Sequence, residues 1–158
     1  MIEQDIQFMT RAIELARLGV ENKEGGPFGC VVVKDGRIVG EGNNRVTSTN
    51  DPTAHAEVVA IREACKALNA FQLDGCTIYT SCEPCPMCLG AIYWARPAAI
   101  YYAGTREDAA TAGFDDEFFY SEIEKPNDER ELRMINMLRE DAQAAFQAWI
   151  NKPDKTEY

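Results

Sequence analysis

The strongest constraint on the fold of this chain is that its only histidine must meet a pair of cysteines in a distant segment. His55 opens one predicted helix, and Cys85 and Cys88 open another. Cysteines three positions apart share a face of a helix, and the positive end of the helix dipole favours their thiolate forms. His55 can supply a third ligand. The sequence therefore predicts a metal site where two helix N-termini converge.

The order of the predicted elements explains how these segments can converge. Apolar spacing predicts helices over residues 6–20, 54–68, 87–95 and 142–150, with short helical pieces at 108–112 and 117–123. β-Branched and apolar runs predict strands over 28–34, 37–43, 77–80 and 98–103. Residues 132–138 fit either a final strand or the start of a helix, and we favour the strand. Asp35-Gly36 predicts a two-residue hairpin between the first two strands. Strands joined by helices imply parallel pairing. The expected fold is therefore α/β, a three-layer α/β/α sandwich with a central mixed five-stranded sheet, and both metal segments lie at one sheet edge.

Bulk composition narrows the class of protein. The length of 158 residues suggests a single domain, and no stretch is apolar enough to span a bilayer. The acidic N-terminal residues 1–5 do not resemble a signal peptide, and six cysteines in such a chain do not suggest a disulfide framework, so we expect a cytoplasmic protein. The net charge is -10, from 16 basic and 26 acidic residues. This balance favours a small neutral or cationic substrate and predicts neither a nucleic-acid partner nor a membrane partner.

Two kinds of zinc site fit the cysteines. Three protein ligands, His55, Cys85 and Cys88, leave one position of Zn²⁺ open for water, which is the arrangement of a catalytic site. A closed Cys₃His site that also used Cys82 would be purely structural. Pro84 and Pro86 place a turn between Cys82 and the helix, which favours the open site, with Cys82 ending the strand.

Glu57 lies two positions after His55 and helps to distinguish the open catalytic zinc site from the closed structural one. An acidic residue in the first turn of a helix is common for reasons of the helix dipole alone. Beside a three-ligand zinc, however, a carboxylate that does not bind the metal can move protons as a general acid and base. The pattern His-x-Glu followed by Pro-Cys-x-x-Cys, residues 55–57 and 84–88, is the signature of zinc deaminases.

Beyond this signature, the chain resembles the bacterial guanine deaminases of the cytidine/deoxycytidylate deaminase superfamily over nearly its whole length. The resemblance is carried by residues 25–29, 42–46, 50–55, 91–97, 112–116 and 156–158. It implies zinc-dependent hydrolysis of guanine to xanthine and ammonia in purine catabolism or salvage. Glu57 would take a proton from water, protonate ring nitrogen 3 and then protonate the leaving amine.

The resemblance also implies a set of substrate contacts. Asn44 would hydrogen-bond the purine, Asp116 would accept from its N–H donors, and Phe28 would stack on the ring. The implied substrate-binding residues are Asn44, Asp116, Phe28, Ala56 and Tyr158. From the residues alone, Asn44 could equally be a turn residue, Asp116 a solvated acid and Phe28 a core residue.

Similar proteins form homodimers that exchange C-terminal segments, which implies exchange of residues at about 130–158 and closure of the partner's site by Tyr158. Alternative functions remain open at the level of sequence. They are deamination of guanosine, isocytosine, cytosine, cytidine or an aminotriazine, deamination of adenosine in transfer RNA, and a structural zinc module.

Overall fold

A computed structural model describes residues 3–158 of the chain. It divides into two compact units, Met1–Asp116 and Glu117–Tyr158, and each is described by itself. The first unit contains the sheet and every residue of the predicted metal site. The second unit contains two helices and irregular chain.

The sheet of the first unit has four strands in the order β2-β1-β3-β4. They are β1 (Gly29–Lys34), β2 (Arg37–Asn43), β3 (Thr77–Cys82) and β4 (Ala99–Gly104). β1 pairs antiparallel with β2 and with β3, and β3 pairs parallel with β4. Asp35 and Gly36 both have positive φ, which is the conformation of a tight hairpin turn, so the predicted hairpin is confirmed.

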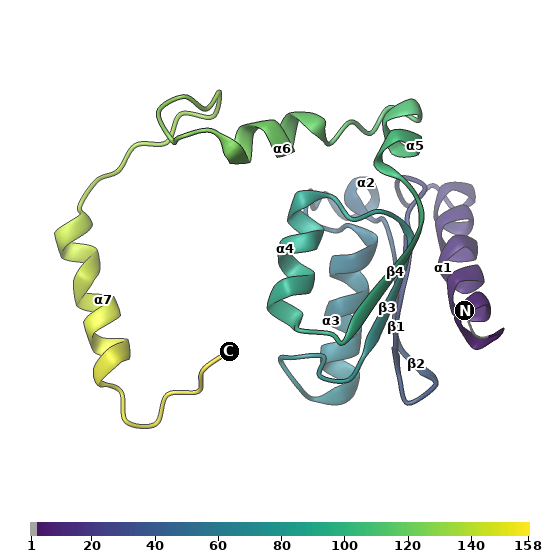
Figure 1. Cartoon of the computed structure of the whole chain (residues 1–158), viewed down its shortest axis with the longest axis horizontal. Coiled ribbons are helices and arrows are strands. Elements are labelled where there is room, and N and C mark those ends of the chain that lie inside the picture. The colour runs from purple at the N-terminus through teal and green to yellow at the C-terminus, as the bar shows by residue number, and fades with distance from the viewer. Residues whose placement is uncertain (1–2) are drawn as a thin grey trace. The chain divides into compact units, whose positions relative to one another are not determined.

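Helices cover both faces of this sheet (Figure 1). They are α1 (Glu3–Glu21) on one face and α3 (Ala56–Leu68) and α4 (Pro86–Ala95) on the other. Two apolar clusters lie between the layers, one around Ile78 on the side of α3 and α4 and one around Tyr79 on the side of α1. Neighbouring residues of β3 thus point to opposite faces, as a strand requires. The predicted three-layer arrangement is confirmed.

Close approach of helix to strand fixes where α3 begins. A Cβ atom on Gly42 of β2 would lie 2.2 Å from the carbonyl oxygen of Ala56, so only glycine permits this contact. The first residue of α3 is thereby held directly against the sheet. Because His55 and Glu57 flank Ala56, the same contact fixes the start of the predicted metal site.

Two further helices of the first unit lie outside the layers: α2 (Val46–Thr49) and α5 (Arg106–Thr111). α5 corresponds to a predicted helical piece and begins with a capping box made by Thr105 and Asp108. α2 was not predicted, because its four residues are polar or β-branched and carry no apolar period.

The second unit contains α6 (Glu117–Glu124) and α7 (Arg139–Asn151), both at predicted positions. The fifth strand predicted at residues 132–138 was wrong, since this segment has neither helix nor strand structure. A strand needs a neighbour to receive its backbone hydrogen bonds, and no residue of the second unit is in a strand. Leu138 also adopts a left-handed conformation, φ 53°, which ends any extended run before α7. The sheet described above therefore has four strands and not five.

Within residues 3–158, the longest and most apolar helices still fall short of what a membrane span requires.

Candidate active site

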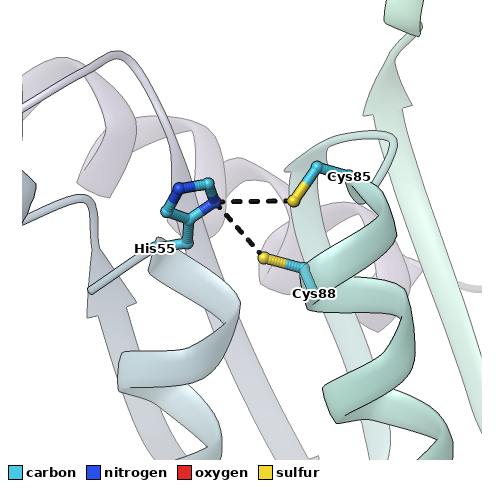
Figure 2. Close-up of side chains that lie close together, drawn as sticks. All are labelled: His55, Cys85 and Cys88. Carbon is cyan, nitrogen blue, oxygen red and sulfur yellow. Dashed lines mark hydrogen bonds between the residues drawn. The ribbon is translucent and has the colours of Figure 1, made fainter. Parts of the chain in front are cut away.

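The metal-binding side chains lie at the first residues of two neighbouring helices. His55 is the N-cap of α3 and Cys85 is the N-cap of α4, and both have extended backbone conformations. Pro86 occupies the first position of α4, where its missing N–H costs nothing. Cys88 follows in the same turn and is buried. Figure 2 shows one nitrogen of the His55 ring facing both sulfur atoms, each of which comes from α4 or its N-cap.

The distances within this group fit zinc. His55 Nδ1 lies 3.6 Å from the Sγ atom of Cys85 and 3.5 Å from that of Cys88. The possible donor atoms of the three residues all lie within 4.8 Å of one another. A tetrahedral zinc with bonds of about 2.0 Å to nitrogen and 2.3 Å to sulfur holds such ligands about 3.5 Å apart. The three donors therefore fit one Zn²⁺ with its fourth position left for water.

The two cysteines compete for one proton. A hydrogen bond from the Cys88 thiol is the largest influence on Cys85 and, with His55, lowers the pKa of Cys85 to about 4. The same hydrogen bond, together with burial, raises the pKa of Cys88. A thiol that coordinates zinc is deprotonated outright, so the metal would remove this competition.

Cys82 lies near this group but points elsewhere. Its Sγ contacts the carbonyl oxygen of Thr105 at 3.5 Å, and it is absent from the set of mutually close donors among the described residues. Burial, followed by the charges of Glu57 and Asp116, raises the pKa of Cys82 to about 11. Cys82 therefore lies outside the group of three mutually close donors, His55, Cys85 and Cys88.

Glu57 is a buried carboxyl group beside the metal ligands. Its exposed fraction is 6%, and burial is the main cause that raises its pKa. Thr80 on β3 donates a hydrogen bond to Glu57 Oε1 at 3.3 Å. A buried carboxyl group whose pKa is raised in this way holds a proton more readily than a solvated one, which suits a general acid and base.

Glu57 and two of the metal ligands, His55 and Cys85, open onto a cavity of about 220 Å³. The cavity is lined by Gly26, Phe28, Asn44, Val46, Thr47, His55, Glu57, Cys82, Glu83, Cys85, Ala109, Phe114 and Asp116. The structure thus brings together six residues singled out from the sequence: the metal ligands His55 and Cys85, and Glu57, Asn44, Phe28 and Asp116. None of these described lining residues is a lysine or arginine.

Asn44 presents a fixed face to this cavity. Its Oδ1 atom accepts hydrogen bonds from the backbone N–H groups of Gly26 at 3.2 Å and Val46 at 3.1 Å. Because only the carbonyl end of the amide can accept from two donors, the orientation of the side chain is settled. The Nδ2 group of Asn44 is therefore the end available to a ligand, as a donor.

The remaining cavity wall is aromatic and acidic. Phe28 and Phe114 meet edge to face, with ring centroids 4.9 Å apart. Asp116 follows in the same loop, and partial burial, then the charge of Cys85, raises its pKa. Asp116 can accept hydrogen bonds while Asn44 donates them, so the cavity offers complementary polar groups beside an aromatic surface.

Two predicted contacts lie elsewhere. Ala56 is fully buried as the first residue of α3 and is not among the cavity-lining residues. Tyr158 belongs to the second unit, where its exposed fraction is 67%. Sequence reasoning did not find the cavity residues Gly26, Val46, Thr47, Glu83, Ala109 and Phe114. The only available signal was the resemblance itself, whose segments 25–29, 42–46 and 112–116 include three of them, Gly26, Val46 and Phe114.

The fold and this donor set define a zinc-dependent deaminase. The family model for the cytidine and deoxycytidylate deaminase zinc-binding region matches residues 2–104, and the chain belongs to that family. It is accordingly a zinc-dependent aminohydrolase.

Individual known proteins resemble the chain over different shares of its length. The chain is 60% identical to the guanine deaminase of Bacillus subtilis (strain 168) over 151 residues, which is 96% of this chain and 97% of that protein. An X-ray structure of guanine deaminase from B. subtilis matches with a TM-score of 0.95 and 57% identity, and covers 100% of this chain and 99% of that one. The tRNA-specific adenosine deaminase of Agrobacterium fabrum (strain C58 / ATCC 33970) is 45% identical over 95 residues, 60% of this chain and 62% of that protein.

Proposed function

We propose that this enzyme hydrolyses guanine to xanthine and ammonia. The observation that carries the proposal is the polar pair in the cavity wall, with Asn44 as a fixed donor and Asp116 as an acceptor. Guanine offers acceptors at its carbonyl and ring nitrogens and donors at its ring N–H and amino groups. The 60% identity with a guanine deaminase, which extends over both units, supports the same substrate.

The cavity also favours a base over larger substrates. Its volume of about 220 Å³ lies below the range of about 300–1,000 Å³ that is usual for sites of drug-sized ligands. Its described wall carries Glu57, Glu83 and Asp116 and no lysine or arginine. A phosphate group would be repelled there, which argues against a nucleotide or an RNA.

Zinc at His55, Cys85 and Cys88 would supply Lewis-acid activation of a water molecule. Glu57 takes the proton that the water loses and delivers it to ring nitrogen 3 of the base. The oxygen adds to carbon 2, and Glu57 then takes the second proton of that oxygen and gives it to the amino group. The carbon–nitrogen bond breaks, the oxygen becomes a carbonyl, and guanine and water become xanthine and ammonia. Asn44, Asp116 and the ring of Phe28 hold the base during these steps.

Substrate competition tests this proposal. The zinc-loaded protein is incubated with guanine, guanosine, isocytosine, cytosine, cytidine and adenosine, and ammonia release is followed. We expect guanine to have the highest kcat/KM, and faster turnover of a nucleoside would contradict the assignment. Glu57→Gln should retain zinc and lose about 10²- to 10⁴-fold in kcat, the usual contribution of a general acid and base. Full activity of that variant would exclude the proton-transfer role.

We propose further that the enzyme is a cytoplasmic homodimer that exchanges residues at about 130–158, so that Tyr158 completes the partner's site. The second unit supports this, because many of its apolar side chains are exposed: Leu132, Ile135, Met137, Leu138, Phe146 and Ile150. Large apolar groups in such number usually mark an interface. Six free thiols, Cys30, Cys65, Cys76, Cys82, Cys85 and Cys88, suit a reducing compartment.

Complementation between two inactive variants tests the exchange. Glu57→Gln retains Tyr158, and Tyr158→Ala retains Glu57. Refolding the two together should restore activity above that of either alone, because a mixed dimer has one site with both residues. Activity no greater than the sum of the separate variants would show that Tyr158 does not act across subunits.

A further inference from the structure

The hydroxyl group of Thr80 is buried in apolar surroundings, where a polar atom is unfavourable unless it has a partner. It lies on β3 with an exposed fraction of 1%, on the same face as Ile78 because residues two apart in a strand share a face. That face meets the apolar cluster between the sheet and α3, which includes Cys30, the residue that pairs with Thr80 in β1. Valine has the same branched shape and would suit this environment without a buried polar atom.

The hydroxyl has one side-chain partner, the carboxyl group of Glu57. Thr80 Oγ1 lies 3.3 Å from Glu57 Oε1, and both residues are buried. Glu57 lines the cavity, whereas Thr80 does not. Thr80 therefore lies behind Glu57 as seen from the substrate and can influence the reaction only through it.

We propose that Thr80 is a positioning residue that holds Glu57 by Oε1 and so directs the other carboxylate oxygen toward the cavity. A hydroxyl group both donates and accepts, so it can stay bonded whether or not Glu57 carries a proton. This inference rests on the proposed function, because it assigns Thr80 to the residue proposed to transfer protons.

The test compares Thr80→Val and Thr80→Ser with the zinc-loaded wild-type enzyme, using guanine. Thr80→Val removes the hydroxyl and should lower kcat about 10- to 100-fold, the scale of a misplacement of about 1 Å, with KM within about threefold. Thr80→Ser keeps the hydroxyl and should retain at least about half of kcat. Thr77→Val, on the same strand but outside the cavity lining, is the matched control and should behave like the wild type.

Two readouts separate positioning from a general structural effect. Thr80→Val should retain zinc by elemental analysis, and in a Glu57→Gln background it should cause no further loss of kcat, because Thr80 acts through Glu57. Wild-type kcat in Thr80→Val, a further loss in the Glu57→Gln background, or loss of zinc would each overturn the proposal. If the wild-type enzyme releases no ammonia from guanine, the proposed function has failed. The Thr80–Glu57 bond is then tested by a double-mutant cycle of unfolding free energies, in which zero coupling overturns it.

Discussion

Gly25 should control how tightly the enzyme binds its substrate, although it does not line the cavity. A Cβ atom at Gly25 would lie 2.3 Å from Asn44 Oδ1 and 2.5 Å from the Asn44 backbone oxygen. Real Cβ atoms essentially never lie closer than 3.0 Å to such an atom and mostly lie beyond 3.4 Å, so Gly25→Ala must displace the Asn44 amide or its backbone by roughly 0.7–1 Å. The displaced Oδ1 loses its hydrogen bonds from Gly26 and Val46, and the Nδ2 group loses its fixed direction.

The size of the effect follows from the hydrogen bonds involved. One neutral hydrogen bond to the substrate is worth about 0.5–1.5 kcal/mol, which corresponds to an increase of about 2- to 12-fold in KM. The two backbone N–H groups left without Asn44 cost about 1–3 kcal/mol in folding free energy. For a chain of this size that lowers Tm by about 2–12 °C. The kcat value should stay within about threefold, because Glu57 and the metal ligands lie on α3 and α4.

Steady-state kinetics with guanine and a thermal melt measure both effects in one preparation. Gly90→Ala is the matched control, since a Cβ atom there meets no atom within 4 Å, and alanine in a helix is favourable by up to about 1 kcal/mol. We expect that control to have wild-type KM and an equal or higher Tm. Wild-type KM in Gly25→Ala would refute the reasoning that close packing at Gly25 orients Asn44 for the substrate.

Two further predictions concern the metal site and the surface. Cys82→Ser should retain about one zinc per chain by elemental analysis, because Cys82 contacts Thr105 and not the donor group, whereas loss of zinc would favour the closed structural site. The hydrogen bond from Arg11 lowers the pKa of Glu41 in the folded state. The pair therefore stabilises the folded state fully at pH values above the unfolded pKa of Glu of about 4.3. This stabilisation is lost as the pH falls through the lower pKa that Glu41 has in the folded state. Urea unfolding should therefore find Glu41→Gln about 0.5–1 kcal/mol less stable than the wild type at pH 7, a value that already allows for the partial exposure of the pair. The difference in unfolding free energy should vanish in acid. A difference that grew in acid would contradict the assigned pairing.

Sequence reasoning succeeded where one local pattern determines the structure. The Asp35-Gly36 hairpin is fixed by backbone chemistry in the turn, and the strands and helices that flank it carry clear apolar periods. It failed at residues 132–138, where an apolar composition resembled a strand but no neighbouring strand exists in the second unit to pair with it. A strand forms by pairing with a neighbouring strand, and the composition of one segment does not show whether such a neighbour exists.

Only part of the cavity wall could be predicted from the sequence, because the wall also depends on which distant segments meet. Asn44 and Asp116 were found through resemblance, but Glu83 and Phe114 acquire their places because loops far apart in the sequence meet over the same volume. Thr80 was predicted only as part of a strand, since its neighbour Glu57 comes from another layer. Periodicity identifies which face a side chain occupies and does not identify what lies opposite.

The spacing of the metal motif itself has a structural explanation. Residues two apart on a helix do not face one another, so His55 and Glu57 could not serve one site if both were helical. His55 is instead the extended N-cap, ψ 156°, and only Glu57 lies within the helical turn. Cys85 and Cys88 repeat this arrangement on α4, with Cys85 at ψ 166°. Neither His55 nor Cys85, both within residues 3–158, uses its side chain to cap its helix, so both side chains are available to the metal and both helix dipoles point their positive ends at the thiolates.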